Sequence, residues 1–124
     1  MKNLLDYIQE KQTSLFKETG VIFAFSQKQF EEQRKEGVVY VNLGMGCLVP
    51  KENMEDFKTR HAQLIEDGIA QDLQENGKEA IIIRELENFE CFYTGDVSND
   101  VIEYLDGYQI TKEEIFNVFN SKRL

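Results

Sequence analysis

The sequence predicts an α+β fold, with a small sheet of about three strands packed by one long helix and followed by short acidic helices. Two observations carry this prediction. Short apolar runs such as Val21–Phe25 alternate along the chain with longer segments of helical periodicity. The acidic excess also falls on the segments predicted to be the C-terminal helices. With 124 residues and 41% hydrophobic residues, the chain is predicted to form a single domain over residues 1–124.

The first predicted elements are a helix over residues 3–19 and a strand over Val21–Phe25. Apolar side chains recur at helical spacing in the first segment, and Gly20 suits the position after its last turn. The second segment is continuously apolar, as in a buried strand. Ser26 and Gln29 fit a capping box, which predicts that another helix begins there.

A second strand is predicted at Val38–Leu43, where apolar residues alternate with others. The following Gly44-Met45-Gly46 segment could hold a phosphate with its backbone amides, but it lacks a third glycine and a helix start. We therefore interpret it as a turn that needs positive φ angles. Cys47–Val49 is predicted to extend the sheet until Pro50 ends it.

The longest predicted element is a helix that begins at Asn53 and runs to about Glu75. His61 and Asp72 lie on its otherwise apolar stripe. Gly68, in mid-helix, indicates either close packing against a strand or a kink.

Ala80–Arg84 begins with the most apolar run in the chain and is predicted to be the third strand. The chain then turns helical from Glu85, and Cys91–Thr94 is either part of this helix or a hairpin strand. Because a buried strand would here run directly into a charged helix, this junction is where a site is expected.

The last two predicted helices are Asn99–Asp106, capped by Ser98, and a helix beginning at Thr111. Thr111 and Glu114 form another capping box. The predicted order of elements is therefore α-β-α-β-α-β-α-α-α. The final pair has helix-turn-helix proportions, but its acidic surface argues against DNA binding, which needs Lys or Arg.

The net charge of −9 lies entirely in the second half of the chain. Residues 1–62 hold nine basic and nine acidic side chains, whereas residues 63–124 hold five basic and fourteen acidic ones. Such a field repels phosphate backbones and attracts basic surfaces. We therefore expect a protein partner with a basic surface and no direct binding to nucleic acid.

The sequence indicates a cytoplasmic protein without a membrane segment. No apolar run approaches the ~20 residues that a membrane helix needs, and Asp6 and Glu10 interrupt any secretory hydrophobic region. Cys47 and Cys91 are expected to be reduced thiols, although the sequence leaves a disulfide open.

No catalytic residue, cofactor or metal site is predicted. Cys91 and His61 could supply a nucleophile and a base, but the residues around Cys91 are not electropositive. A histidine on an apolar stripe is expected to be a core-edge residue with one hydrogen bond. Neither the cysteines nor the single histidine has metal-ligand spacing.

The candidate site centres on Arg84, which is expected to pair with Glu85, Glu87 or Glu90. One interpretation is a structural ion pair in which a half-buried Asn88 satisfies backbone groups. The other is a polar pocket or a partner surface at the end of the strand. The candidate binding residues are Arg84, Glu85, Asn88, Glu90, Glu103 and Asp106.

Three segments carry a resemblance: FAFSQKQF (Phe23–Phe30), LGMGC (Leu43–Cys47) and RELENFECFYTGD (Arg84–Asp96). With them the chain resembles a family of small uncharacterised proteins from phages and mobile elements of gut bacteria. The resemblance implies an accessory protein that acts on host or phage machinery in the cytoplasm of a bacterial host, and it assigns no role to any residue.

These observations together predict a non-enzymatic accessory or regulatory protein that binds another protein through its acidic C-terminal surface. The acidic array could imitate a nucleic-acid backbone. The alternative is a small enzyme or ligand-binding domain with a pocket near Arg84, Glu85, Asn88 and Cys91. A structural homodimer is a third hypothesis.

Overall fold

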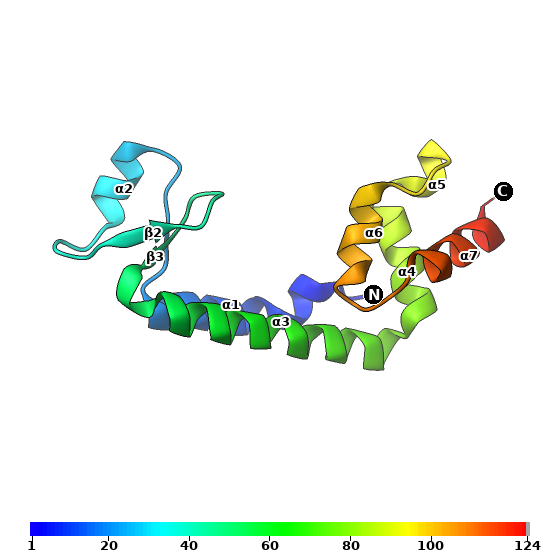
Figure 1. Cartoon of the computed structure of the whole chain (residues 1–124), viewed down its shortest axis with the longest axis horizontal. Coiled ribbons are helices and arrows are strands. Elements are labelled where there is room, and N and C mark those ends of the chain that lie inside the picture. The colour runs from blue at the N-terminus through cyan, green and yellow to red at the C-terminus, as the bar shows by residue number, and fades with distance from the viewer. Residues whose placement is uncertain (124) are drawn as a thin grey trace. The chain divides into compact units, whose positions relative to one another are not determined.

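The computed structural model describes residues 1–123 and is mostly helical, with one small sheet (Figure 1). The chain divides into two compact units. The N-terminal unit is Lys2–Gly68, and the C-terminal unit runs from Ile69 to the end of the chain and includes Met1. None of the helices within residues 1–123 combines the length and the apolar character needed to cross a bilayer.

The N-terminal unit holds the sheet, the whole of one long helix and most of a second. Its elements are α1 (Leu4–Thr19), β1 (Ile22–Phe23), α2 (Gln27–Gln33), β2 (Tyr40–Asn42), β3 (Cys47–Pro50), a short 3₁₀ turn (Lys51–Asn53) and α3 (Met54–Asn76), which continues into the C-terminal unit. The long helix is therefore found where the sequence predicted it.

The sheet is antiparallel, and β3 lies between the other two strands, in the order β1-β3-β2. Ile22 pairs with Leu48 across β1 and β3, and Val41 pairs with Val49 across β2 and β3. The sequence predicted β1 and β2 in the right places, but each of them three residues too long. Cys47–Val49 is confirmed as part of the sheet, where it forms the central strand.

A small apolar core joins this sheet to the helices of the N-terminal unit. Val49 of β3 clusters with Leu15 of α1 and Phe57 of α3, and all three side chains are almost fully buried. The ring of Phe16 stacks on that of Phe57 with 6.1 Å between centroids. Burying these large side chains removes apolar surface from water and thereby holds the sheet on the helix pair.

The turn between β2 and β3 has positive φ angles at Gly44, Met45 and Gly46, of 93°, 53° and 77°. The interpretation of this segment as a turn, rather than a phosphate loop, is confirmed. Gly46 also has no room for a side chain, because a Cβ atom there would lie 2.7 Å from the ring of Phe25.

Gly68 marks a close approach between α1 and α3. A Cβ atom at this position would lie 2.4 Å from Cγ2 of Ile8 and 3.1 Å from Cδ1 of Leu4. Close packing is thus the correct reading of this glycine, but its neighbour is a helix and not the strand that the sequence suggested.

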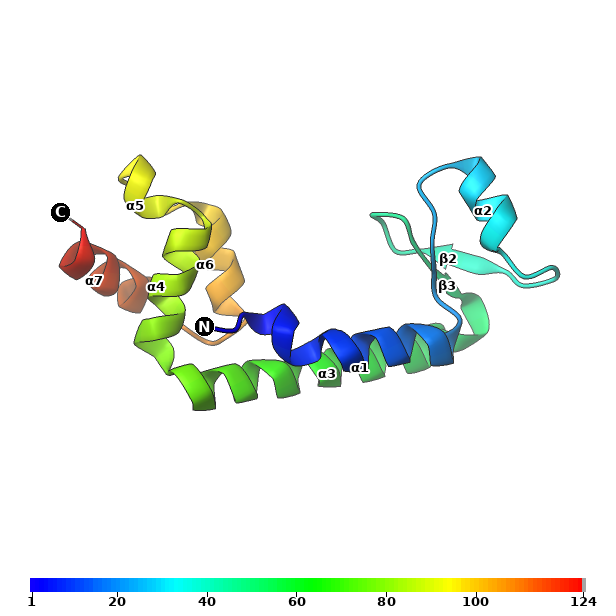
Figure 2. The same cartoon turned by 180° about the vertical axis from the view of Figure 1, so that it is seen from behind.

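The C-terminal unit contains the end of α3 and four further helices, which Figure 2 shows from behind. They are α4 (Lys78–Asn88), α5 (Cys91–Thr94), α6 (Asn99–Asp106) and α7 (Lys112–Lys122). Helices α4, α6 and α7 contact one another. Their buried apolar side chains are Ile81, Ile82, Leu86, Val101, Leu105, Ile115 and Phe119, and Ile110, between α6 and α7, is also buried.

The predicted third strand, Ala80–Arg84, is wrong: these residues lie in the middle of α4. A short apolar run is compatible with a buried strand and with a buried helix, and periodicity alone does not separate the two. Helical spacing accounts for the observed helix, because Ile82 and Leu86 lie at positions i and i+4 and both side chains are buried. The junction from strand to helix therefore does not exist, and α4 is one continuous helix that ends at Asn88.

The remaining helices agree closely with the sequence. Helix α6 has the predicted bounds, with Ser98 as its N-cap. In α7 the capping box between Thr111 and Glu114 is formed in both directions. Cys91–Thr94 is a short helix of its own, so the hairpin alternative is wrong, and the helix expected to continue from Glu85 is interrupted at Glu90, whose φ is 58°. The box expected at Ser26 is half formed, because Ser26 Oγ accepts from the Gln29 amide while Gln29 Oε1 accepts from Phe25.

Candidate functional site

A buried polar network holds the C-terminal unit together around Asp72 of α3. The Arg84 guanidinium donates to both carboxylate oxygens of Asp72, from Nη1 and Nη2, each at 2.9 Å. The Tyr108 hydroxyl donates to Oδ2 at 2.6 Å, and Nδ2 of Asn76 donates to Oδ1 at 2.8 Å. Helix α4 and the segment between α6 and α7 are therefore both tied to a single buried carboxylate of α3.

The same guanidinium binds a second carboxylate within α4. Arg84 Nε donates to Glu85 Oε2 at 2.5 Å, and Asn88 Nδ2 donates to Glu85 Oε1 at 3.3 Å. Side chains of adjacent helical residues normally diverge, so this pairing is held by the long, planar Arg side chain.

The environment shifts the pKa values in opposite directions. Burial alone would raise the pKa of Asp72, but the hydrogen bonds from Arg84, Tyr108 and Asn76 outweigh it and lower that pKa. Burial would likewise lower the pKa of Arg84, and its hydrogen bonds to Asp72 and Glu85 raise it instead. Burial and the hydrogen bond to Asp72 raise the pKa of Tyr108. The Asp72–Arg84 pair is thus held in its ionised form, and the Tyr108 hydroxyl keeps the proton that it donates to Asp72.

This network has the character of a scaffold. Within residues 1–123, every buried side-chain nitrogen or oxygen atom has a hydrogen-bond partner. Arg84 and Glu85 are 8% and 4% exposed, so little of either side chain is left for a ligand. Buried charges that are this well satisfied usually serve the fold, and the expectation that Arg84 pairs with Glu85 is confirmed.

The structure separates the six candidate binding residues into two groups. Arg84 and Glu85 lie inside the network. Asn88, Glu90, Glu103 and Asp106 are exposed. The sequence analysis did not identify the two other principal members of the network. Asp72 could have been found from its position on an apolar helical stripe, whereas Tyr108 carried no such signal.

The two residues considered for thiol chemistry each have a structural environment. Cys91 is fully buried at the start of α5, with its Sγ 4.0 Å from the carbonyl oxygen of Phe89. In the N-terminal unit, His61 stacks on Phe57 with 5.4 Å between centroids, and its Nε2 lies 3.3 Å from Nε2 of Gln12. His61 is therefore confirmed as a core-edge residue with one hydrogen bond.

Metal ligation has no support within residues 1–123, where no group of three or more His, Cys, Asp or Glu side chains could hold an ion. Both cysteines are free thiols. Burial raises the pKa of the Cys47 thiol, which disfavours the thiolate that a metal or an electrophile would need.

The surface of the C-terminal unit is strongly acidic. Of its twelve acidic residues, Asp72 and Glu85 are buried, while Glu79 and Glu114 pair with Lys122 and Lys78 at 3.7 and 3.2 Å. The other eight are exposed and form no ion pair with any residue up to 123: Glu75, Glu87, Glu90, Asp96, Asp100, Glu103, Asp106 and Glu113.

Helix α6 presents three of these carboxylates in a row. Asp100, Glu103 and Asp106 follow each other at steps of three, which places them on one side of the helix. The opposite side carries Val101 and Leu105, which are fully buried. The inward packing of α6 therefore orients its acidic side toward solvent.

A family model described as a family of unknown function, DUF7659, matches residues 4–122. The chain belongs to this family. No curated protein and no solved structure matches the chain. The resemblance seen in the sequence is thus confirmed as membership of an uncharacterised family, while the phage and gut-bacterial origin stays a prediction.

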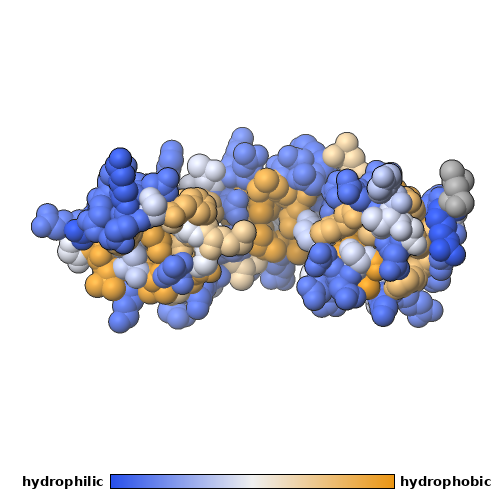
Figure 3. Space-filling model, turned by 90° about the horizontal axis from the view of Figure 1, so that it is seen from above, coloured by the Kyte–Doolittle hydropathy of each residue, from blue (hydrophilic) through white to orange (hydrophobic). Residues whose placement is uncertain are grey.

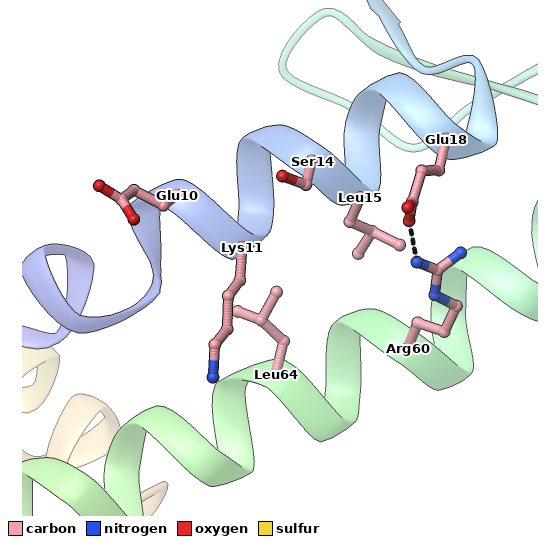
Figure 4. A pocket seen from close by; sticks show the side chains of 7 residues that line it. All are labelled: Glu10, Lys11, Ser14, Leu15, Glu18, Arg60 and Leu64. Atoms are coloured by element: carbon pink, nitrogen blue, oxygen red, sulfur yellow. Dashed lines mark hydrogen bonds and ion pairs between the residues drawn. The ribbon is translucent and has the colours of Figure 1, made fainter.

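A groove of about 400 Å³ between α1 and α3 was not found by sequence reasoning (Figure 4). Leu15 and Leu64 point into it from the two helices, and Lys11 and Arg60 lie at its sides (Figure 4). Arg60 is engaged with Glu18 and, at 3.3 Å, with Asp56. Apart from the two leucines, the residues that line the groove are polar or charged, and no hydrogen bond joins Ser14 to Glu10 or Glu18.

Proposed function

We propose that this protein is a non-enzymatic accessory or regulatory protein that binds another protein through the acidic surface of its C-terminal unit. The observation that carries the proposal is the row of exposed carboxylates at Asp100, Glu103 and Asp106 on α6, together with the five further exposed acids of the unit. A partner protein that complements this acidic surface would have Lys and Arg side chains on its own binding surface.

The buried network supports this proposal because it separates structural charge from surface charge. Arg84 neutralises the acids inside the unit, so it does not offset the carboxylates outside. A surface of one sign steers an oppositely charged partner and speeds their association. A basic protein surface that otherwise holds nucleic-acid phosphates fits best, and the acidic unit would then act as a nucleic-acid mimic in the cytoplasm of a phage or mobile-element host.

The alternative, a small enzyme or ligand-binding domain with its pocket near Arg84, Glu85, Asn88 and Cys91, has weaker support. Arg84 already binds both Glu85 and Asp72, and the thiol of Cys91 is buried. A ligand would have to displace charge-assisted hydrogen bonds, which are about twice as strong as neutral ones.

The test is affinity capture from a lysate of the host with a charge-neutralised variant, Asp100→Asn/Glu103→Gln/Asp106→Asn. Its matched control, Glu10→Gln/Glu36→Gln/Glu66→Gln, removes three exposed acids from the N-terminal unit. We expect the wild type and the control to capture the same proteins, identified by mass spectrometry, and the α6 variant to lose them.

The captured proteins should also dissociate in about 1 M salt, where the Debye length is only about 3 Å. Circular dichroism verifies that both variants are folded. Capture that survives both neutralisation of α6 and high salt would show that the interface lies elsewhere on the molecule.

A further inference from the structure

The three-stranded sheet of the N-terminal unit has one covered edge and one open edge. At the β1 edge, Nε2 of Gln33, from α2, donates to the outward-facing carbonyl oxygen of Phe23 at 2.8 Å. Ile22 and Ala24 are directed toward β3, and the amide of Ala24 donates to the Gly46 carbonyl at 2.9 Å. The side chain of Gln33 therefore occupies the position that an added strand would need.

The β2 edge has no such cover. The odd-numbered residues of the strand face β3: the Lys51 amide donates to Val39 at 2.8 Å, the Leu43 amide donates to Cys47 at 2.9 Å, and Val41 pairs with Val49. In an antiparallel ladder the alternate residues direct their backbone groups the other way. The amides and carbonyls of Tyr40 and Asn42 thus point out of the sheet, where no residue up to 123 bonds them.

Apart from its shortness, this edge also lacks the usual protection against pairing. Natural edge strands carry charges, proline or bulges, whereas Val38–Gly46 contains neither a charged residue nor proline. Val39 is 65% exposed and Leu43 is 41% exposed. Hydrophobic atoms are also visible at the surface of this unit, on the left of Figure 3.

We infer that β2 pairs with β2 of a second copy of this chain, antiparallel and about a two-fold axis at Val41. In this register Tyr40 lies opposite the partner's Asn42, and each such pair exchanges two backbone hydrogen bonds, giving four. Val39 lies opposite the partner's Leu43. The two most exposed apolar side chains flanking the strand then cover each other across the interface, twice by symmetry.

The distribution of charge also favours a second copy of this chain as the partner at the β2 edge. Residues 20–53, which include the whole sheet, carry four basic and four acidic side chains, so two copies of this region do not repel each other. The acidic excess lies in the C-terminal unit. This dimerisation is independent of the proposed function, because it uses the other unit and apolar contacts.

The arrangement closes at two chains. Pairing through β2 joins two three-stranded sheets into one of six strands, whose outer edges are both β1. Gln33 covers each of these edges, so no third chain can add. Because β2 is short, with three residues, the dimer is expected to be weak and to dissociate on dilution.

The first test is sedimentation velocity from about 1 μM to about 1 mM protein, a range that covers weak association. We expect the wild type to change from monomer to dimer. Val39→Lys and Leu43→Lys should each weaken the dimer about ten-fold or more, because each lysine enters the interface twice. Val39→Glu/Leu43→Lys should restore it, since each Glu then faces a Lys of the partner.

The second test fixes the register by oxidative cross-linking in a Cys47→Ala background. Val39→Cys alone and Leu43→Cys alone place their thiols too far from their own symmetry mates, whereas a mixture of the two variants places the thiols opposite each other. A disulfide-linked dimer that forms only in the mixture supports the register.

Three outcomes would overturn the inference. If the wild type remains monomeric throughout the concentration range, β2 does not pair with a second copy, and the open edge is then available to an extended segment of another protein. Cross-linking of either single variant shows a different register, and a lysine variant that still dimerises shows a different interface.

Discussion

In the C-terminal unit the Arg84 guanidinium is buried between Asp72 and Glu85, whereas in the N-terminal unit the Arg60 guanidinium joins Glu18 and Asp56 at the surface. The Arg84 side chain is 9% exposed and that of Arg60 is 43% exposed. Each arginine contacts two carboxylates, so a list of contacts makes them equivalent. Solvation makes them different. If Arg60 is replaced, water solvates its partner carboxylates, whereas the partners of Arg84 are buried and would remain unsolvated.

The comparison also shows where each unit finds its stability. The N-terminal unit joins sheet and helices through apolar contacts around Leu15, Val49 and Phe57, and its charges stay outside. The C-terminal unit places an ion network beside its apolar core and remains strongly acidic outside. The C-terminal unit should therefore be destabilised most by the loss of a charged side chain, and the N-terminal unit by a change in side-chain size at a packed position.

The largest expected effect is that of Arg84→Met. This change leaves Asp72 and Glu85 buried without their cation, and breaking a buried pair in this way typically costs about 3–5 kcal/mol of unfolding free energy. Urea unfolding measures the loss. The matched control, Arg60→Met, should change stability little, because water screens and solvates its partners.

A further variant sharpens this comparison. Replacing Asp72 by Leu in the Arg84→Met background removes one of the orphaned carboxylates, and should recover part of the lost stability. Equal losses for Arg84→Met and Arg60→Met would contradict the distinction between the two arginines.

The next effect is that of Tyr108→Phe, which removes the hydroxyl that donates to Asp72 at 2.6 Å. A hydrogen bond to a charged group contributes about 1.5–3 kcal/mol, so a loss of this order is expected near neutral pH. Tyr93→Phe, at a position that is 91% exposed in the same unit, is the control and should be neutral.

The pH dependence of this loss has a definite sign. The pKa of Asp72 is lowered in the folded state, so the folded chain binds fewer protons there than the unfolded chain. The stabilisation is present above the unfolded pKa of about 3.9 and is lost as the pH falls through the lower folded value. The difference between the wild type and Tyr108→Phe should therefore be constant between about pH 5 and about pH 9 and shrink below about pH 4. It should also shrink above about pH 10, because the pKa of Tyr108 is raised in the folded state. A difference that grows on acidification would assign the effect to another group.

Most of the fold could be predicted where local signals agree. Capping residues and periodicity together located α6 and α7, and a strand ending in Gly-Met-Gly located the β2–β3 turn. The failure at Ala80–Arg84 has a physical cause. Three consecutive Ile residues favour a strand locally, but the burial of Ile82 and Leu86 against neighbouring helices outweighs that preference.

The candidate site could be predicted only in part, because its decisive contacts are distant in sequence. The Arg84–Glu85 pair is local and was expected, whereas the partners Asp72 and Tyr108 lie 36 positions apart and meet only in the folded unit. The cover of one sheet edge by Gln33 was equally hidden, since it depends on where α2 returns to β1. The acidic surface, which is a matter of composition, was visible from the start.

The smallest expected effect compares glycines that lie in negative-φ helical or turn positions, one in each unit. Gly68→Ala places a methyl group 2.4 Å from Cγ2 of Ile8, so this buried side chain would have to shift. Overpacking typically costs about 1–3 kcal/mol, and the better helix propensity of Ala returns up to about 1 kcal/mol. Gly107→Ala meets only the Tyr104 carbonyl oxygen at 3.4 Å, and its φ of −60° suits any residue. It should stabilise the chain by about 0.4–1 kcal/mol, by restricting the unfolded state.

Thermal unfolding measures the change in stability caused by each substitution. Opposite signs of the two changes would support the view that tight packing limits the stability of the N-terminal unit at Gly68. Ile8→Leu supplies the decisive control, because it removes the branched Cγ2 methyl that Gly68→Ala would strike. In the Ile8→Leu background the cost of Gly68→Ala should therefore fall, and the double-mutant cycle should report a coupling of about 0.5 kcal/mol or more. If the two changes are additive, the close approach of α1 and α3 at Gly68 does not limit packing, and the loss must come from the backbone of α3 itself.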